Sequence, residues 1–105
     1  MLPALNWKLA VKLTESDIQT ALANLPGWSY VGEKLHRDYR FANFTLAFGF
    51  MAASATVIEK MNHHPEWTNV YSSVVVELTT HDAGGVTRKD LELAEALEEL
   101  AQRLL

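Results

Sequence analysis

The chain contains no cysteine among its 105 residues. Disulfide bonds and thiolate metal sites are therefore excluded, and folding needs no oxidising compartment. No apolar run approaches 18 consecutive residues, so the sequence does not predict a membrane-spanning helix. The first residues also lack the charged start and long apolar stretch of a signal peptide. We therefore expect a cytoplasmic protein that has no contact with a membrane.

Positive charge is scarce as well. Nine Lys and Arg residues stand against thirteen Asp and Glu residues, which gives a formal net charge of -4. Binding to nucleic acid requires a basic face, so a direct nucleic-acid ligand is not expected. Apolar residues make up 49% of the chain, enough to form a core. We expect one domain over residues 1–105, preceded within that range by an N-terminal arm over residues 1–13.

Three segments carry the signals of helices. Thr14 and Thr87 are each followed three residues later by an acid, as in a capping box, and Asn43 is a plausible N-cap. Apolar residues then recur at helical spacing, and the second helix should end before Pro65 because proline disfavours a helical residue ahead of it. The apolar stripe of this second helix is expected in the core: Phe44, Ala47, Phe48, Met51, Ala55 and Ile58.

Four other segments read as strands, at residues 28–31, 34–41, 68–71 and 74–80. Gly32-Glu33 is expected to turn the first hairpin, and Ser72-Ser73 separates the strands of the second. The element order is α-β-β-α-β-β-α. Two hairpins with helices before, between and after them predict an α+β fold, in which a four-stranded antiparallel sheet has its helices packed on one face.

Three of the four histidines lie within nineteen positions: His63, His64 and His81. Imidazole both accepts and donates protons near neutral pH, so such a cluster suggests proton-transfer chemistry. His63 and His64 would diverge by about 100° on a regular helix, but at a helix end both rings could line one cleft. One of them could instead only cap the helix C-terminus.

The remaining candidate residues have two interpretations each. His81 ends a strand ahead of a glycine pair, where active residues are common, but it could be a solvated loop histidine. Asp90 is an ordinary acid at a helix start, and its carboxylate could also orient a histidine. Trp67 could form a stacking wall for a planar ligand or belong to the core. His36 lies mid-strand without a nearby partner in the sequence, and we interpret it as structural.

Two other chemistries are not favoured. The histidine spacing fits neither H-E-x-x-H nor a zinc finger, so no metal site is predicted. A nucleophilic enzyme is not indicated either, because there is no cysteine and no G-x-S-x-G motif.

Two motifs of the chain resemble a known family. Residues 59–71 read E-K-M-N-H-H-P-E-W-T-N-V-Y, and residues 80–91 read T-H-D-A-G-G-V-T-R-K-D-L. Together with L-P-G-W at residues 25–28 and F-A-N-F at residues 41–44, they closely resemble the pterin-4a-carbinolamine dehydratases. The resemblance extends over nearly the whole chain.

The resemblance implies dehydration of 4a-hydroxytetrahydropterin to quinonoid dihydropterin, which recycles the pterin cofactor of aromatic amino-acid hydroxylation. The catalytic residues it implies are His63, His64, His81 and Asp90. The substrate contacts it implies are Asn62, His63, His64, Thr79, Thr80, His81 and Asp82, to which we add Trp67 as the stacking candidate. Loss of water requires one basic and one acidic group, which two imidazoles supply. Neither a metal nor another cofactor is expected.

Association with other chains is also predicted. The last helix carries Leu93 and Leu105 off its main apolar stripe, which suggests a second contact surface. An exposed strand edge of the second hairpin could also pair with a neighbouring chain. The family resemblance implies a homo-oligomer, either a dimer or a tetramer. By the same analogy, some members bind a homeodomain transcription factor, and relatives without the histidines act in the assembly of other proteins.

Overall fold

A computed structural model describes residues 11–105 and contains helices, a sheet and one short 3-10 turn. The first residues of the predicted arm, 1–10, lie outside the described range. The elements in chain order are α2 (Glu15–Leu22), β1 (Ser29–Val31), β2 (Lys34–Arg40), α3 (Phe44–Met61), β3 (Glu66–Val70), β4 (Ser73–Leu78), η1 (His81–Ala83) and α4 (Arg88–Gln102).

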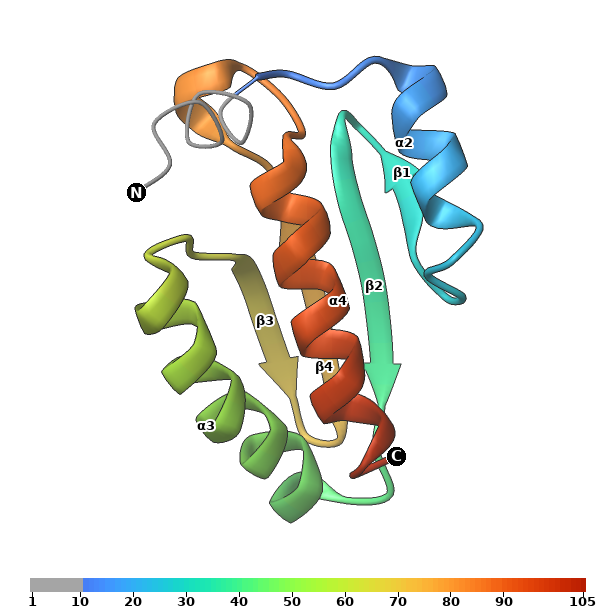
Figure 1. The fold of residues 1–105 in the computed structure, drawn as a ribbon. Coiled ribbons are helices and arrows are strands. Elements are labelled where there is room, and N and C mark those ends of the chain that lie inside the picture. The colour runs from blue at the N-terminus through green and yellow to red at the C-terminus, as the bar shows by residue number, and fades with distance from the viewer. Residues whose placement is uncertain (1–10) are drawn as a thin grey trace.

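The four strands form one antiparallel sheet in the order β1-β2-β4-β3. The two hairpins therefore join through β2 and β4, and β1 and β3 become the edges. Helices α3 and α4 cover one face of this sheet, and α2 lies beside β1 (Figure 1). The predicted α+β fold and its element order are confirmed.

All three predicted helix starts have the expected caps. The hydroxyls of Thr14 and Thr87 accept backbone N–H groups in complete capping boxes, and the Asn43 side chain accepts the N–H of Leu46 at 2.9 Å. Each cap satisfies a donor that the first helical turn leaves free. These helix starts could thus be read from the sequence alone.

The core lies between the sheet and α3 and α4. Burial alternates along β4, where Val74, Val76 and Leu78 face the helices and are fully buried. Tyr39 from β2 and Phe50 from α3 pack there with ring centroids 4.9 Å apart. The opposite face of the sheet carries the alternate residues, which are only partly covered.

Some boundaries differ from the sequence prediction. Strand β3 begins at Glu66 and ends at Val70, because a tight turn follows in which Tyr71 has a left-handed φ of 52°. Ser73 belongs to β4, where it pairs with Val70, and is not part of the turn. In the first hairpin, Gly32-Glu33 forms the predicted turn, with φ values of 60° and 64°.

Two predictions about apolar residues were wrong. Phe44 and Phe48 on α3 are 46% and 57% exposed, and Ala55 is exposed as well. The buried residues of α3 are Ala47, Phe50, Ser54 and Ile58, of which only Ala47 and Ile58 belong to the predicted stripe. Leu93 on α4 is fully buried in the core, so it does not contribute to a second surface. Helix α3 therefore carries two exposed phenylalanines.

Helix α3 is long and apolar enough to span a membrane by length and composition alone. This is weak evidence, because the core helix of a soluble protein passes the same criteria. Here α3 packs against α4 and the sheet.

Candidate active site

A cleft opens where α3 ends, β4 ends and α4 begins. Its volume is about 350 Å³, at the lower end of the range for small-molecule sites. The cleft is lined by Asn62, His63, His64, Thr79, Thr80, His81, Asp82 and Lys89. The structure thus brings together the three histidines of the sequence cluster.

The end of α3 sets the directions of two of these histidines. Asn62 adopts the left-handed conformation, with φ 52° and ψ 42°, and the N–H of His63 returns to the carbonyl of Ile58 at 3.4 Å. A left-handed residue after the last turn is a common way to end a helix. Because the backbone is no longer helical, His63 turns inward and His64 outward while both line the cleft.

His63 is held by a buried carboxylate. Its Nε2 lies 2.5 Å from Oδ1 of Asp90, and its side chain is only 12% exposed. Asp90 itself is fully buried. A carboxylate at this distance favours a proton on Nε2, so Nδ1 is left as the nitrogen that can exchange a proton with a ligand.

The second oxygen of Asp90 is fixed from the other side. Oδ2 accepts the Thr80 hydroxyl at 2.7 Å and the Thr87 backbone N–H at 2.9 Å. The hydroxyls of Thr80 and Thr87 are also 2.8 Å apart. Asp90 therefore completes the capping box of α4 and contacts His63 at the same time.

The other two histidines are exposed. His64 is 59% exposed, with its Nε2 3.3 Å from Oε1 of Glu59. His81 is 77% exposed, with its Nε2 3.2 Å from Oε2 of Glu66. Lys34 donates to the second oxygen of Glu66 at 2.6 Å. This hydrogen bond holds the pKa of Glu66 below its usual range and raises the pKa of Lys34.

Trp67 does not line the cleft. It lies on β3, packs partly buried against the core, and borders a separate hollow with Glu66, Thr68, Val75 and Glu77. Its use as a stacking wall stays a prediction without support from this geometry. His36 also lies away from the cleft, but it does have a partner: the sheet register sets it opposite Glu77, with Nδ1 3.3 Å from Oε2.

Sequence reasoning missed three residues around the cleft. Lys89 lines it directly, one position before Asp90. A basic residue in the first turn of a helix opposes the helix dipole, and that signal could have marked it. Glu66 contacts His81, and its place directly after the His-His-Pro sequence was an available hint. Lys34 lies 32 residues before Glu66, so only the folded sheet shows that they meet.

Across residues 11–105, no three His, Asp or Glu side chains come together in a way that could hold a metal ion. The cleft offers imidazoles, hydroxyls, an amide, a carboxylate and an ammonium group. Such a set can bind a polar planar ligand and move protons on it.

Comparison with known proteins gives one family. The sequence profile described as pterin 4 alpha carbinolamine dehydratase matches residues 11–100. A Solibacter usitatus protein named as a candidate pterin-4-alpha-carbinolamine dehydratase is 55% identical over 93 residues, which cover 89% of this chain and 98% of that protein. A Nitrobacter winogradskyi protein of the same name is 56% identical over 94 residues, 88% of this chain and 93% of that one.

Solved structures agree on the fold. A Brucella melitensis protein described as a transcriptional coactivator/pterin dehydratase aligns with a TM-score of 0.83 at 44% identity, over 86% of this chain and 98% of its own. A pterin dehydratase-like RuBisCO assembly factor of the alpha-carboxysome aligns with a TM-score of 0.62 at 20% identity, over 71% and 89%, and supports the fold alone. On the profile match and the identities of its relatives, the chain belongs to the pterin-4a-carbinolamine dehydratase family.

Proposed function

We propose that this protein is a 4a-hydroxytetrahydropterin dehydratase that works by histidine acid–base catalysis. The observation that carries the proposal is the contact between His63, which lines the cleft together with His64 and His81, and the buried carboxylate of Asp90. Membership of the family supports a pterin substrate.

The reaction needs two proton transfers. One imidazole removes the proton from N5 of the pterin ring, and another protonates the hydroxyl group at C4a. The C4a–O bond breaks, water leaves, and a C=N bond forms between C4a and N5, so atoms and electrons balance. A well-placed acid or base contributes about 10²–10⁴-fold to such a step.

The Asp90 carboxylate supports this chemistry at His63. A fixed negative charge stabilises the imidazolium form and holds the ring so that Nδ1 faces the ligand. The other residues lining the cleft, which include Asn62, Thr79 and Asp82, are the proposed contacts of the pterin. The product, quinonoid dihydropterin, would then be reduced to the tetrahydropterin cofactor in the cytoplasm.

The test compares three histidine variants in a direct assay of carbinolamine dehydration. We expect His63→Ala and His81→Ala to lower kcat by at least about tenfold. His36→Ala is the matched control, since His36 also pairs with a glutamate but lies outside the cleft. Equal losses in all three variants would mean that stability, not catalysis, is affected. Activity should also survive a chelator, and its loss would revive a metal mechanism.

We also propose that the chain forms a homo-oligomer, in which α3 provides one contact surface. Phe44 and Phe48 are exposed with ring centroids 5.7 Å apart, and large exposed apolar groups of this kind often mark an interface. Light scattering at micromolar concentration should give a dimer or tetramer, and Phe48→Glu should reduce the mass. A wild-type mass of one chain would refute this.

A transcription-factor partner stays a prediction by family analogy, supported by the description of the Brucella melitensis relative as a coactivator.

A further inference from the structure

The cleft has a second histidine–carboxylate pair besides His63 and Asp90, formed by His81 and Glu66. Glu66, the first residue of β3, places Oε2 3.2 Å from Nε2 of His81 in η1. Its other oxygen accepts the ammonium group of Lys34, the first residue of β2, at 2.6 Å. Strand β4 separates β2 from β3, so Lys34 reaches across it to hold Glu66.

The packing around His81 does not by itself set the orientation of its ring. Its side chain is 77% exposed, and it borders two hollows at once. One is the cleft, which also contains the charged or titratable groups of His63, His64, Asp82 and Lys89. The other has a volume of about 250 Å³, contains Glu33 and Lys34, and shares Thr79 and His81 with the cleft. Open space on both sides means that packing does not fix the ring.

Among the described residues, Glu66 makes the one polar side-chain contact found for His81. A carboxylate accepts hydrogen bonds and does not donate, so it selects the tautomer of His81 that carries the proton on Nε2. Nδ1 is then left to exchange a proton with the ligand. His63 has the same arrangement, because Asp90 also contacts its Nε2.

Lys34 explains why Glu66 stays in place. Glu66 pairs with Glu77 across β3 and β4, and like charges directly opposite each other are unfavourable. The ammonium group of Lys34 offsets this repulsion and holds one oxygen, which favours the orientation in which the other oxygen faces His81. Its hydrogen bond also keeps the pKa of Glu66 low, and the carboxylate remains ionised at neutral pH.

We propose that Glu66 is a positioning residue that sets the tautomer and orientation of His81, and that Lys34 anchors Glu66 for this task. The proposal rests on the proposed function of His81 as a proton-transfer group.

The test is Glu66→Gln, followed by NMR of the histidine side-chain nitrogens at about pH 8.5, where imidazole with an ordinary pKa is neutral. Lys34 only donates hydrogen bonds, so the glutamine oxygen should face Lys34 and its NH₂ group should face His81. His81 should then change from the Nε2–H to the Nδ1–H tautomer. We expect kcat to fall about tenfold, with less than about a threefold change in KM.

Glu77→Gln is the matched control. It removes the same charge from the residue directly opposite Glu66, and its own partner is His36, outside the cleft. Glu77→Gln should leave the His81 tautomer and kcat unchanged. An equal loss of kcat in both variants would indicate a general electrostatic effect and overturn the proposal. An unchanged tautomer in Glu66→Gln would overturn it as well.

Lys34→Gln is the second variant, and it decides the matter if Glu66→Gln does not fold. It should give a mixture of His81 tautomers, with a loss of kcat smaller than that of Glu66→Gln. A pure Nε2–H signal in Lys34→Gln would contradict the anchoring role. If the wild-type protein lacks dehydratase activity, the proposed function fails, whereas the tautomer of His81 still supports or refutes its positioning by Glu66.

Discussion

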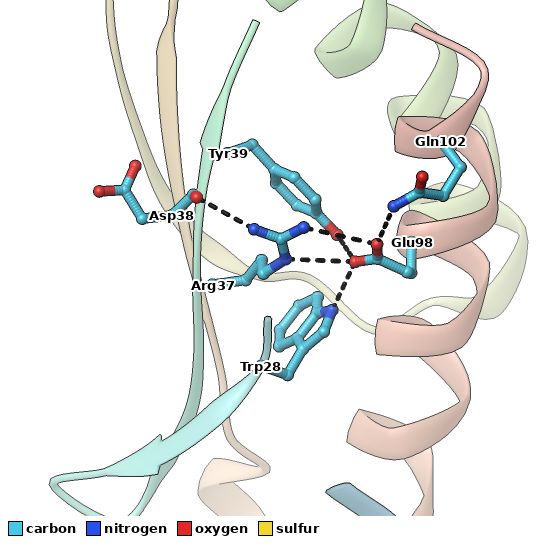
Figure 2. A network of polar contacts seen from close by, with 6 residues as sticks. All are labelled: Trp28, Arg37, Asp38, Tyr39, Glu98 and Gln102. Atoms are coloured by element: carbon cyan, nitrogen blue, oxygen red, sulfur yellow. Dashed lines mark hydrogen bonds and ion pairs between the residues drawn. The ribbon is translucent and has the colours of Figure 1, made fainter. Parts of the chain in front are cut away.

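Helix α4 carries two largely buried carboxylates, Asp90 in its first turn and Glu98 two turns later. Glu98 accepts hydrogen bonds from four side chains (Figure 2): Trp28 at 2.9 Å, Arg37 at 3.3 Å, Tyr39 at 2.7 Å and Gln102 at 2.5 Å. Asp90 gives one oxygen to structural donors and the other to His63. Glu98 therefore joins elements of the fold, whereas Asp90 also joins the fold to a titratable ring.

Cavity size does not separate these two regions. The hollow beside Glu98 has a volume of about 520 Å³, against about 350 Å³ for the histidine cleft. Both oxygens of Glu98 are occupied by side chains of the fold, and the guanidinium of Arg37 is also stacked 4.2 Å above the Tyr39 ring. What distinguishes the cleft is a proton acceptor or donor left available to a ligand, not its volume.

Replacement of Glu98 should have the largest effect on the free energy of unfolding. Glu98→Ala leaves Trp28, Arg37 and Tyr39 without their common acceptor, and loss of one partner of a buried charged pair costs about 3–5 kcal/mol. The free energy of unfolding, measured in urea, should fall by this amount. The kcat of the fraction that remains folded should be close to that of the wild type. A large loss of kcat at full folding would remove the distinction between the two carboxylates.

Asp90→Asn should lower kcat strongly and stability only slightly, the reverse of Glu98→Ala. Its oxygen can still accept the Thr80 and Thr87 donors, which turns its NH₂ group towards Nε2 of His63 and reverses the tautomer of that ring. We expect kcat to fall about 100-fold, with a stability loss of no more than about 2 kcal/mol. Unfolding in urea and dehydration kinetics on the same sample measure both. A loss confined to stability would make Asp90 only a helix cap.

Gly27→Ala should also lower stability through the Glu98 region, by less than Glu98→Ala. Gly27 has a φ of 89°, and a Cβ there would lie 2.7 Å from Cζ of Arg37, which Glu98 holds in place. The left-handed conformation alone costs a residue with a side chain about 1–2 kcal/mol. Gly32→Ala is the control, because its φ is 60° but no atom lies within 4 Å of the added Cβ. A greater loss of stability in Gly27→Ala would measure the displacement of Arg37.

A change of pH should have the smallest effect on the stability that Glu98 contributes. Burial raises the pKa of Glu98, but the hydrogen bonds from Tyr39, Gln102, Arg37 and Trp28 outweigh it and hold this pKa below its ordinary value. The unfolded chain therefore takes up the proton at a higher pH than the folded protein. The stabilisation from Glu98 is present above about pH 4.5 and is lost as the pH falls through the folded pKa. Glu98→Gln, compared by urea unfolding between pH 7 and pH 3, should lose less stability on acidification than the wild type.

Local signals made much of the fold predictable. Capping residues such as Thr14 and Thr87 act within four positions, and the alternating residues of β4 mark its buried face directly. The His63–Asp90 pair was also within reach, because a motif and a helix start each drew attention to one partner. These features depend on residues that are close in the sequence or on patterns that recur along one element.

Features that depend on the order of the strands were not predictable. His36 has no partner nearby in the sequence, and only the pairing of β2 with β4 sets it opposite Glu77. Lys34 meets Glu66 only because both strands flank β4. Phe48 was assigned to the core because it has helical spacing, but spacing does not tell which stripe of α3 faces the sheet. In each case the partner lies on another element, and a single sequence does not encode the choice locally.

The left-handed residue that ends α3 has a consequence for the entropy of the site. Asn62 belongs to a residue type that adopts this conformation more readily than most. Pro65 has a nearly fixed φ and already restricts His64 to extended conformations in the unfolded chain. The segment that carries two of the three histidines therefore has fewer conformations to lose on folding than an unrestricted loop of the same length. The backbone of this segment is therefore already restricted in the unfolded chain, which lowers the entropy lost when the cleft forms.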